Sequence, residues 1–366
     1  MKISFISAAQ IPSDTANSIQ VMKVCQAFIQ LGHTVSLLVP GNQPTTVSHQ
    51  QLQSQYGLQV SFPIEWLPVR KRRFFPWKAA WRAKRSGADL LYAWPLQAAA
   101  LGLLAGMPSM MELHDLPSGT FGQLWLGFFL RFPGKKRLLP ITEALRSRLH
   151  LPLEQTVIAP DGVDIERYRA LPDAQSARLQ LNLPDATTVL CTGHLYAGRG
   201  AHLFLKLAAE FPQTSFVWVG GRPADVQTWK ARASSLNNVL FTGFLPNERM
   251  PIYQSAADVL LMPYERTVTT SSGGNTAEIC SPMKMFEYMA SGRAILSSDL
   301  PVLREVLDET KAVFCPLEQT EAWKSALGGL LADPQRRQAL AQNARAAVEQ
   351  YSWVERAKRA LNGFEA

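Results

Sequence analysis

The sequence of 366 residues has little of what would indicate a metal, disulfide or redox protein. Its four cysteines, Cys25, Cys191, Cys280 and Cys315, stand far apart and form no Cys-x-x-Cys motif or Cys/His cluster. A disulfide framework or zinc site is therefore not expected, and a reducing compartment fits. The chain also lacks an Asp-x-Asp motif, so we expect no bound divalent metal ion.

Long apolar runs are missing as well. No window of about 18 uninterrupted apolar residues occurs, which argues against a membrane-spanning helix. The first apolar run, residues 2–7, is shorter than the core of a signal peptide and is typical of a β-strand. We therefore expect a cytoplasmic protein.

Positive charge is concentrated in the first half of the chain. Residues 1–160 hold 16 Lys and Arg against 7 Asp and Glu, and the remainder holds 21 against 22, so the first half accounts for the formal net charge of +8. With 47% hydrophobic and 18% charged residues, the composition is that of a globular protein. The length suits two domains, each with its own core.

Short apolar runs alternate with helical stretches along both halves. Strands are predicted at 2–7, 34–39, 89–94, 109–113, 137–142, 187–193, 215–221, 239–244, 258–263, 294–299 and 312–316. Strand–helix–strand order predicts parallel sheets, and hence an α/β fold of two doubly wound Rossmann-like domains. A ligand is expected at the carboxyl ends of the strands, in the cleft between the domains.

A Pro-Asp-Gly turn within residues 157–168 marks the predicted domain boundary. We assign residues 1–165 to the first domain, 166–350 to the second, and 351–366 to a C-terminal helix. The apolar residues of that helix recur at i, i+4 and i+8, and we expect this face to pack back on the first domain.

One segment, residues 278–294, predicts an anion site. If Ser281 caps a helix with Pro282 in its first turn, Met283–Met289 is helical and Gly292 ends it. The free amides at the helix start then bind a phosphate, and Glu287 accepts hydrogen bonds from ligand hydroxyls. Phosphate and diol together describe a nucleotide. A capped surface helix with a solvated glutamate explains this segment equally well.

Three further stretches carry polar residues directly after predicted strands. In residues 192–202, Arg199 stands between two glycines, where its guanidinium can reach phosphate oxygens. Residues 12–23 are small and polar, but they do not form the GxGxxG dinucleotide motif. Residues 111–119 place His114 and Asp115 at a strand end, although a lone histidine is more often structural.

Taken together, these stretches resemble the retaining glycosyltransferases of the GT-B fold, of the family 4 (group 1) type. The resemblance covers nearly the whole chain. It is carried by SDTANSIQVMKVCQAFIQLGHTV, ELHD, APDGVDIERY, GHLYAGRG, VWVGG, NVLFTGFLPNERMPIYQSAADVLLMPY, SPMKMFEYMASGRAILSSDLPVLREVL and the closing YSW. It implies two domains facing a cleft, and a nucleotide diphosphate sugar as co-substrate without any cofactor.

The resemblance also implies the roles of the charged residues. In the pyrophosphate-binding element, Arg199 takes the place of the family's lysine and His194 that of its arginine, with Lys284 as a second cation. Glu287 matches the second glutamate of the family's Glu-x7-Glu pair, which binds ribose. The first falls on Ile279, and Glu278 lies one residue early, so either Glu278 or backbone groups hold the donor sugar.

The remaining implied contacts come from the backbone and from the first domain. The catalytic group comprises His114, near the reacting sugar, with Arg199 and Glu278. Further donor-binding residues are Asn17, Ser281, Met283 and, for the base, Gly243, Phe244 and Leu245. Backbone recognition of the base leaves the nucleotide open, and we favour a UDP-sugar over a GDP-sugar.

Two stretches, 70–85 and 121–137, interleave basic and aromatic residues. Such stretches suit an anionic membrane surface, single-stranded nucleic acid or a plain solvated face. We expect peripheral binding to the inner membrane and no nucleic acid. The residues assigned to membrane or acceptor contact are Arg70, Lys71, Arg72, Arg73, Trp77, Trp81, Trp125, Lys135 and Lys136.

The predicted function is therefore metal-independent, retaining transfer of a hexose to a lipid-linked or polysaccharide precursor. The alternatives are a nucleotide-sugar 2-epimerase on the same scaffold and a basic nucleic-acid-binding protein.

Overall fold

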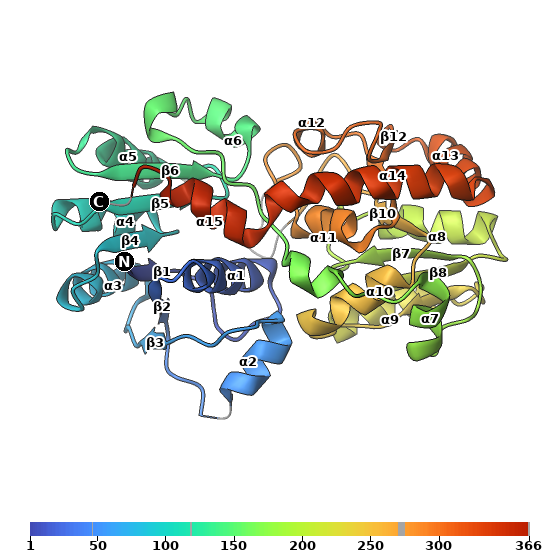
Figure 1. Ribbon diagram of the computed structural model, residues 1–366, viewed down its shortest axis with the longest axis horizontal. Coiled ribbons are helices and arrows are strands. Elements are labelled where there is room, and N and C mark those ends of the chain that lie inside the picture. Colours follow the sequence, from blue (N-terminus) through green and yellow to red (C-terminus); the bar gives the residue numbers. More distant parts are fainter. Residues whose placement is uncertain (46, 118, 270–274, 365–366) are drawn as a thin grey trace. The chain divides into compact units, whose positions relative to one another are not determined.

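The computed structural model describes residues 1–45, 47–117, 119–269 and 275–364, and it divides into two compact units (Figure 1). The first unit contains Met1–Asp161 and Trp353–Ala366, and the second contains Gly162–Ser352. Both divisions fall within a few residues of the predicted boundaries. The amide of Val163 donates to the carbonyl of Tyr351 at 3.1 Å, so the second unit begins and ends at one place.

The first unit is built on a six-stranded parallel sheet with the order β3-β2-β1-β4-β5-β6. Its strands are β1 (Lys2–Ile6), β2 (Thr34–Pro40), β3 (Ile64–Leu67), β4 (Leu90–Ala93), β5 (Ser109–Leu113) and β6 (Lys136–Pro140). The central strands are almost wholly buried, as expected for a sheet covered on both faces. Sequence patterning did not predict β3, a four-residue edge strand that is mostly half-buried.

Helices cover both faces of this sheet. They are α1 (Ala16–Gln30), α2 (His49–Tyr56), α3 (Phe75–Arg85), α4 (Leu96–Leu104), α5 (Gly119–Arg131), α6 (Glu143–Arg148) and α15 (Trp353–Leu361). The chain moves along the sheet in one direction from β1 to β2, and in the other from β3 through β4 and β5 to β6. Right-handed connections therefore place α1 on one face and α3, α4 and α5 on the other.

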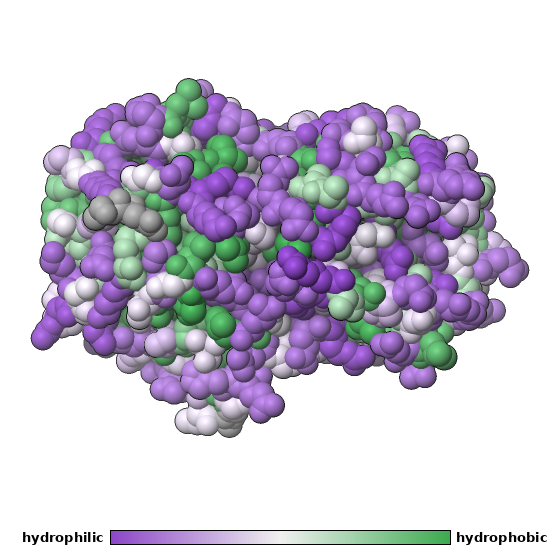
Figure 2. Space-filling view, in the orientation of Figure 1, coloured by the Kyte–Doolittle hydropathy of each residue, from purple (hydrophilic) through white to green (hydrophobic). Residues whose placement is uncertain are grey.

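The C-terminal helix α15 packs against α1, in front of the first sheet in the view of Figure 1. Its apolar residues Trp353, Ala357 and Leu361 are buried. Figure 2 shows the face that α1 and α15 cover, where hydrophilic residues predominate and apolar ones form scattered groups.

The second unit repeats the scheme with a parallel sheet of order β12-β11-β10-β7-β8-β9. All six strands were predicted: β7 (Thr188–Thr192), β8 (Ser215–Val219), β9 (Val239–Phe241), β10 (Val259–Met262), β11 (Ala294–Ser298) and β12 (Val313–Cys315). Its helices are α7 (Ala174–Gln180), α8 (Ala201–Glu210), α9 (Pro223–Arg232), α10 (Met250–Ser255), α11 (Met283–Ser291), α12 (Pro301–Arg304), α13 (Thr320–Ala332) and α14 (Pro334–Ala347). The α/β fold with two doubly wound units is thus confirmed. Of the helices in the described ranges, none is long and apolar enough to cross a membrane.

Candidate functional site

The loop after β7 holds Arg199 on a turn that only glycine permits. Gly198 and Gly200 have φ angles of 83° and 79°, in the left-handed region. A Cβ atom at Gly198 would overlap the carbonyl oxygen of Thr267, and one at Gly200 would overlap that of Pro263. The Gly-Arg-Gly sequence therefore lets this loop lie directly on the segment that follows β10.

Arg199 and Lys284 meet at one aromatic ring, that of Tyr264. The Arg199 guanidinium lies 5.2 Å from the ring centroid and donates to the phenol oxygen at 3.2 Å. The Lys284 ammonium lies 4.7 Å from the same centroid. Cation–π attraction offsets part of the repulsion between the two charges. Tyr264 was not among the predicted site residues, although it is an aromatic residue just beyond the carboxyl end of a buried strand.

Neither cation forms an ion pair with a carboxylate within the described residues. Lys284 donates to the carbonyl of Thr192 at 3.1 Å, and Arg199 to that of Thr269 at 3.4 Å. Burial raises the pKa of the Cys191 thiol, and the positive charges of Lys284 and Arg199 oppose that rise. The carboxyl ends of β7 and β10 thus carry two positive charges that an anion can neutralise.

Helix α11 begins beside these cations. It starts at Met283 and ends at Ser291, and Gly292 caps it with a φ of 65°, as predicted. The predicted cap was wrong: the N-cap is Pro282, with extended backbone and no side-chain hydrogen bond, and Ser281 is buried one residue before it. By helix geometry, the amides of Met283 and Lys284 lack intrahelical acceptors. They are available to the same anion.

Glu287 lies one turn further along α11 and is half-buried. Its Oε2 accepts a hydrogen bond from Gln254 Nε2 at 3.0 Å, and Gln254 Oε1 accepts one from the Tyr168 hydroxyl at 2.8 Å. Gln254 and Tyr168 are buried. This relay fixes the Glu287 carboxylate on the helix that also carries Lys284.

Glu278 lies in a turn before α11, and its side chain is exposed. Ile279, which stands where the resemblance expects the first glutamate, is a buried core residue. In the polar loop that precedes this turn, residues 270–274 lie outside the described part of the chain.

The predicted base pocket, the backbone of residues 243–245, follows β9 and lies beside glycines that follow β7 and β8. Gly193, Gly220 and Gly243 all have positive φ angles, and Gly220 pairs with Gly243 in an isolated bridge. A Cβ at Gly220 would lie 2.5 Å from the carbonyl oxygen of Gly193. Phe244 is 42% exposed beside this bridge, and Leu245 is half-buried. The three glycines allow a flat ligand to approach the backbone closely.

His194 lies in the same loop as Arg199 but faces a different aromatic ring. It stacks on Tyr196 with ring centroids 4.9 Å apart, and the Arg222 guanidinium lies 5.7 Å from the Tyr196 centroid.

The first unit holds a separate buried polar cluster around Glu112, the penultimate residue of β5. Its carboxylate pairs with Arg356 of α15, and both side chains are about 99% buried or more. Tyr92 and Gln20 donate to it as well. The predicted His114 joins this cluster, because its Nε2 lies 2.8 Å from Glu112 Oε1. Sequence reasoning missed Glu112 and Arg356, although a carboxylate inside an apolar strand is an unusual feature.

Glu112 and Asp161, a buried carboxyl group that interacts electrostatically with this cluster, have pKa values shifted in opposite directions. Burial would raise the pKa of Glu112, but the charges of Arg356 and His114 lower it to about 2. Burial raises the pKa of Asp161 to about 6, against the opposing effect of His114 and Arg356. Asn17, by contrast, is exposed in the first turn of α1.

The residues predicted to contact a membrane lie on and beside α3 and α5, which flank α4. Trp77 and Trp81 are 53% and 58% exposed, and Phe121 and Leu124 add further exposed apolar surface on α5. The four basic residues at 70–73 and Lys135 are exposed, and Trp125 is half-buried. Lys136 is also half-buried, and it donates to the carbonyls of Leu130 and Phe132, so it closes the end of α5.

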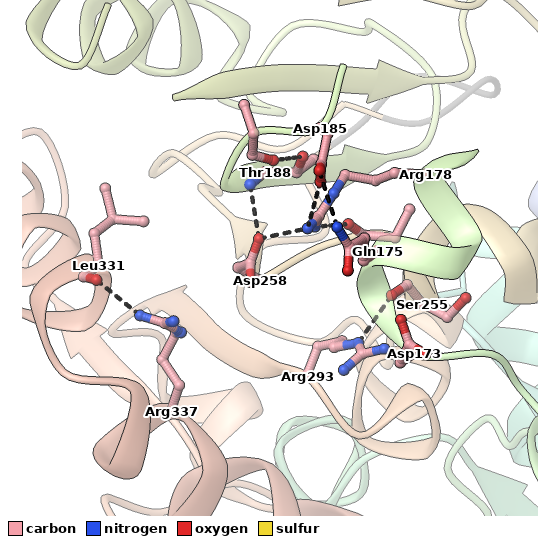
Figure 3. Close-up of polar contacts among 12 residues, drawn as sticks. Asp173, Gln175, Arg178, Asp185, Thr188, Ser255, Asp258, Arg293, Leu331 and Arg337 are labelled. Atoms are coloured by element: carbon pink, nitrogen blue, oxygen red, sulfur yellow. Dashed lines mark hydrogen bonds and ion pairs between the residues drawn. The ribbon is translucent and has the colours of Figure 1, made fainter. Parts of the chain in front are cut away.

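The second unit also contains a cavity of about 700 Å³ at the amino ends of β10 and β11, lined in part by α14. Figure 3 shows its polar surroundings: Asp258 accepts from Thr188 and Arg178, Arg293 donates to Ser255, and Arg337 donates to Leu331. Arg293 and Arg337 thus bind carbonyls at the ends of α10 and α13. None of the predicted donor-binding residues lines this cavity.

Comparison with known proteins assigns a family to most of the second unit. Residues 186–333 match the family described as Glycosyl transferases group 1. A GDP-mannose-dependent alpha-(1-6)-phosphatidylinositol monomannoside mannosyltransferase of Mycolicibacterium smegmatis is 30% identical over 55% of this chain and 53% of its own length. A phosphatidyl-myo-inositol mannosyltransferase of the same organism is 24% identical over 91% of this chain and 85% of its own. The chain spans about half the length of the first curated relatives it matches.

Solved structures share the whole fold. The Anabaena protein Alr3699/HepE in complex with UDP has a TM-score of 0.76 at 17% identity, covering 100% of this chain and 99% of that one. Sucrose-phosphate synthase from Thermosynechococcus elongatus has a TM-score of 0.71 at 20% identity, covering 99% and 98%. The second unit thus carries a glycosyl transferases group 1 domain, and the complete chain has the two-domain α/β fold of GT-B glycosyltransferases.

Proposed function

We propose that the protein is a glycosyltransferase that moves a hexose from a nucleotide diphosphate sugar to an acceptor, with retention of configuration and without a metal ion. The observation that carries this proposal is the pairing of Arg199 and Lys284 at the Tyr264 ring. Two cations that pair with no carboxylate of the described residues, beside the start of α11, form a site for a diphosphate.

The donor lies along α11 in this account. The diphosphate contacts Arg199, Lys284 and the first amides of the helix, and Glu287 accepts hydrogen bonds from the ribose. Gly243, Phe244 and Leu245 accommodate the base, for which we propose uracil. As the bond between the sugar and the diphosphate breaks, negative charge develops on the diphosphate. The two fixed cations stabilise this charge in place of a metal ion.

The acceptor is proposed to be lipid-linked, and the protein to work at the cytoplasmic face of the inner membrane. The names of two relatives, the phosphatidylinositol monomannoside mannosyltransferase and an alpha-galactosylglucosyldiacylglycerol synthase of Streptococcus pneumoniae, support a lipid acceptor. The exposed Trp77 and Trp81 next to the basic residues 70–73 support membrane contact, since aromatic residues prefer the interface and basic ones attract anionic lipids.

A thermal-shift panel of uridine, guanosine and adenosine diphosphate sugars in the presence of EDTA tests the donor assignment. A ligand present at 100 times its Kd stabilises the native state by about 2.7 kcal/mol. We expect UDP-sugars to raise the Tm of the wild type and of Arg336→Ala, a control at an exposed arginine of α14, but not that of Arg199→Ala. Stabilisation that requires a divalent metal would contradict the metal-independent account.

A further inference from the structure

The cavity of about 700 Å³ at the amino ends of β10 and β11 has no part in the proposed glycosyl transfer. Its volume lies within the range of small-molecule sites, which is about 300–1,000 Å³. One wall is α14, and the other is formed by the residues just before β10 and by the turn between α11 and β11. Small residues leave the space between these walls: Ala257, Gly292, Ala294, Ala341 and Ala346.

The two carboxylates that line the cavity each have a cationic partner. Asp258 pairs with Arg178 at 3.1 Å, and Glu349 pairs with Arg345 at 3.2 Å. The other two arginines of the lining, Arg293 and Arg337, form no ion pair within the described residues.

Arg293 and Arg337 donate to backbone carbonyls instead, as Figure 3 shows. Arg293 Nε donates to the carbonyl of Ser255 at 3.0 Å, and Arg337 Nη1 to that of Leu331 at 2.9 Å. These carbonyls lie at the ends of two helices, each of which carries about half a negative charge. The two guanidinium groups therefore bring about one positive charge more than the helix ends compensate. Burial lowers the pKa of Arg293, which indicates that its charge is partly removed from water.

Both guanidinium groups still have N–H groups for a ligand. Arg293 uses Nε and Nη2 for its carbonyl contacts, and Arg337 uses only Nη1. The remaining nitrogens donate to no group of the described residues, and none of them is buried. A guanidinium can donate two parallel hydrogen bonds to a phosphate. Arg337 has one complete edge for this contact, formed by Nε and Nη2.

Two amides complete the polar lining. Gln338 and Gln342 lie one turn apart on α14, and both are exposed at the cavity. Their side chains form no hydrogen bond with other described residues. A glutamine amide both donates and accepts, so each can bind a hydroxyl group of a ligand.

We propose that this cavity is a second ligand site, separate from the donor site, which binds a phosphate monoester of a polyhydroxy compound. The phosphate lies against Arg337 and Arg293, and the hydroxyls contact Gln338 and Gln342. A phosphate monoester carries a charge of about −1.5 to −2 near pH 7, so one such group neutralises the positive charge of the cavity. The inference is independent of the proposed function, because none of the donor-binding residues lines the cavity.

Isothermal titration of the full-length chain with glycerol 3-phosphate, in a buffer without phosphate, tests the proposal. Glycerol and inorganic phosphate are titrated beside it, since they carry only the hydroxyls and only the phosphate. We expect glycerol 3-phosphate to bind at millimolar concentration, inorganic phosphate to bind more weakly and glycerol not to bind. Saturating UDP should not displace the ligand. No binding of glycerol 3-phosphate, equal binding of inorganic phosphate, or displacement by UDP would overturn the proposal.

Two variants of α14 locate the site. Arg337→Gln keeps an amide that can donate to the Leu331 carbonyl but lacks the guanidinium edge, so we expect the affinity to fall at least about tenfold. Its control is Arg336→Gln, at an exposed arginine of the same helix that does not line the cavity. Gln342→Trp fills the cavity from an exposed position and should abolish binding, whereas Gln335→Trp, outside the cavity, should not.

Both controls should bind glycerol 3-phosphate as the wild type does. A folded Arg337→Gln variant with the affinity of the wild type would overturn the proposal. If that variant does not fold, Gln342→Trp decides, and unchanged binding there would place the ligand elsewhere.

Discussion

Arg199 in the loop after β7 and Lys284 in the first turn of α11 approach the same Tyr264 ring, at 5.2 and 4.7 Å from its centroid. Tyr264 is 3% exposed and therefore rigid. It holds both charges in place before any ligand arrives, which is the condition for electrostatic stabilisation of a leaving group.

Replacing Arg199 by alanine removes one of these two charges. We expect kcat/KM for the donor to fall by roughly 10²–10³, the size typical of one preorganised donor in an active site. Steady-state kinetics of Arg199→Ala beside Arg336→Ala measures this. Activity of the first variant within about threefold of the wild type would remove Arg199 from the site.

Glu287→Gln tests the ribose contact. The substitution keeps the size of the side chain and leaves an oxygen that can accept from Gln254, so we expect the fold to be unchanged. Nucleotide binding should weaken by roughly 1.5–3 kcal/mol through the loss of charge-assisted hydrogen bonds. Isothermal titration with UDP measures this, and an unaltered Kd would show that Glu287 does not contact the nucleotide.

Substitution of Glu278 distinguishes between two possible sets of contacts to the donor sugar: its carboxylate, or backbone groups near Ser281. Its side chain is exposed, whereas Ile279, at the position the resemblance assigns to the first glutamate, is buried. If the Glu278 carboxylate contacts the sugar, Glu278→Ala lowers turnover by at least tenfold, and we expect this result. Unchanged turnover would instead leave the sugar to backbone groups near Ser281.

The raised pKa of Asp161 should make the stability of the protein depend on pH. Because its folded pKa of about 6 lies above the usual 3.8, the native state binds more protons between these values. The contribution of Asp161 to the free energy of unfolding is therefore full at low pH and is lost as the pH rises through about 6. The total loss is up to about 3 kcal/mol. Asp161→Asn cannot ionise, so its Tm should exceed that of the wild type near pH 7 by more than near pH 4. An equal difference at both pH values would contradict the raised pKa.

Membrane contact is tested by sedimentation with vesicles. We expect a variant with Ser at all four basic positions, Arg70, Lys71, Arg72 and Arg73, to be released from anionic vesicles. Each well-placed charge contributes about 1 kcal/mol to the free energy of binding. The control replaces four exposed basic residues of the second unit by Ser: Lys230, Arg232, Arg249 and Arg336. It should still sediment. Equal binding of the wild type to neutral and anionic vesicles, or to neither, would contradict the proposal.

The sequence predicted the parts of this protein that depend on local patterns. Buried parallel strands are continuous apolar runs, so the central strands of both sheets were found. The edge strand β3 was not, because four half-buried residues do not form such a run. The start of α11 was also placed correctly, but whether Ser281 or Pro282 occupies the cap depends on backbone angles that composition does not determine.

The packing of the last helix on the first unit was expected, but the individual side-chain contacts between distant segments could not be predicted from the sequence. Nothing near Glu112 indicates that its partner is Arg356 in the last helix, because the pair forms only when α15 packs on the first unit. The same holds for Tyr264 between its two cations, and for Lys136, whose local pattern suggested a free surface charge.

Donor cleavage in the presence of EDTA tests the central claim most directly. The wild type is incubated with a UDP-hexose and anionic vesicles containing bacterial lipid extract, and both UDP release and the mass of the lipid product are measured. We predict UDP release at the same rate with and without EDTA, a lipid heavier by one hexose, and rates at least 10²-fold lower for Arg199→Ala. Loss of activity in EDTA, or UDP release that Arg199→Ala leaves unchanged, would contradict a metal-free diphosphate site built on Arg199 and Lys284.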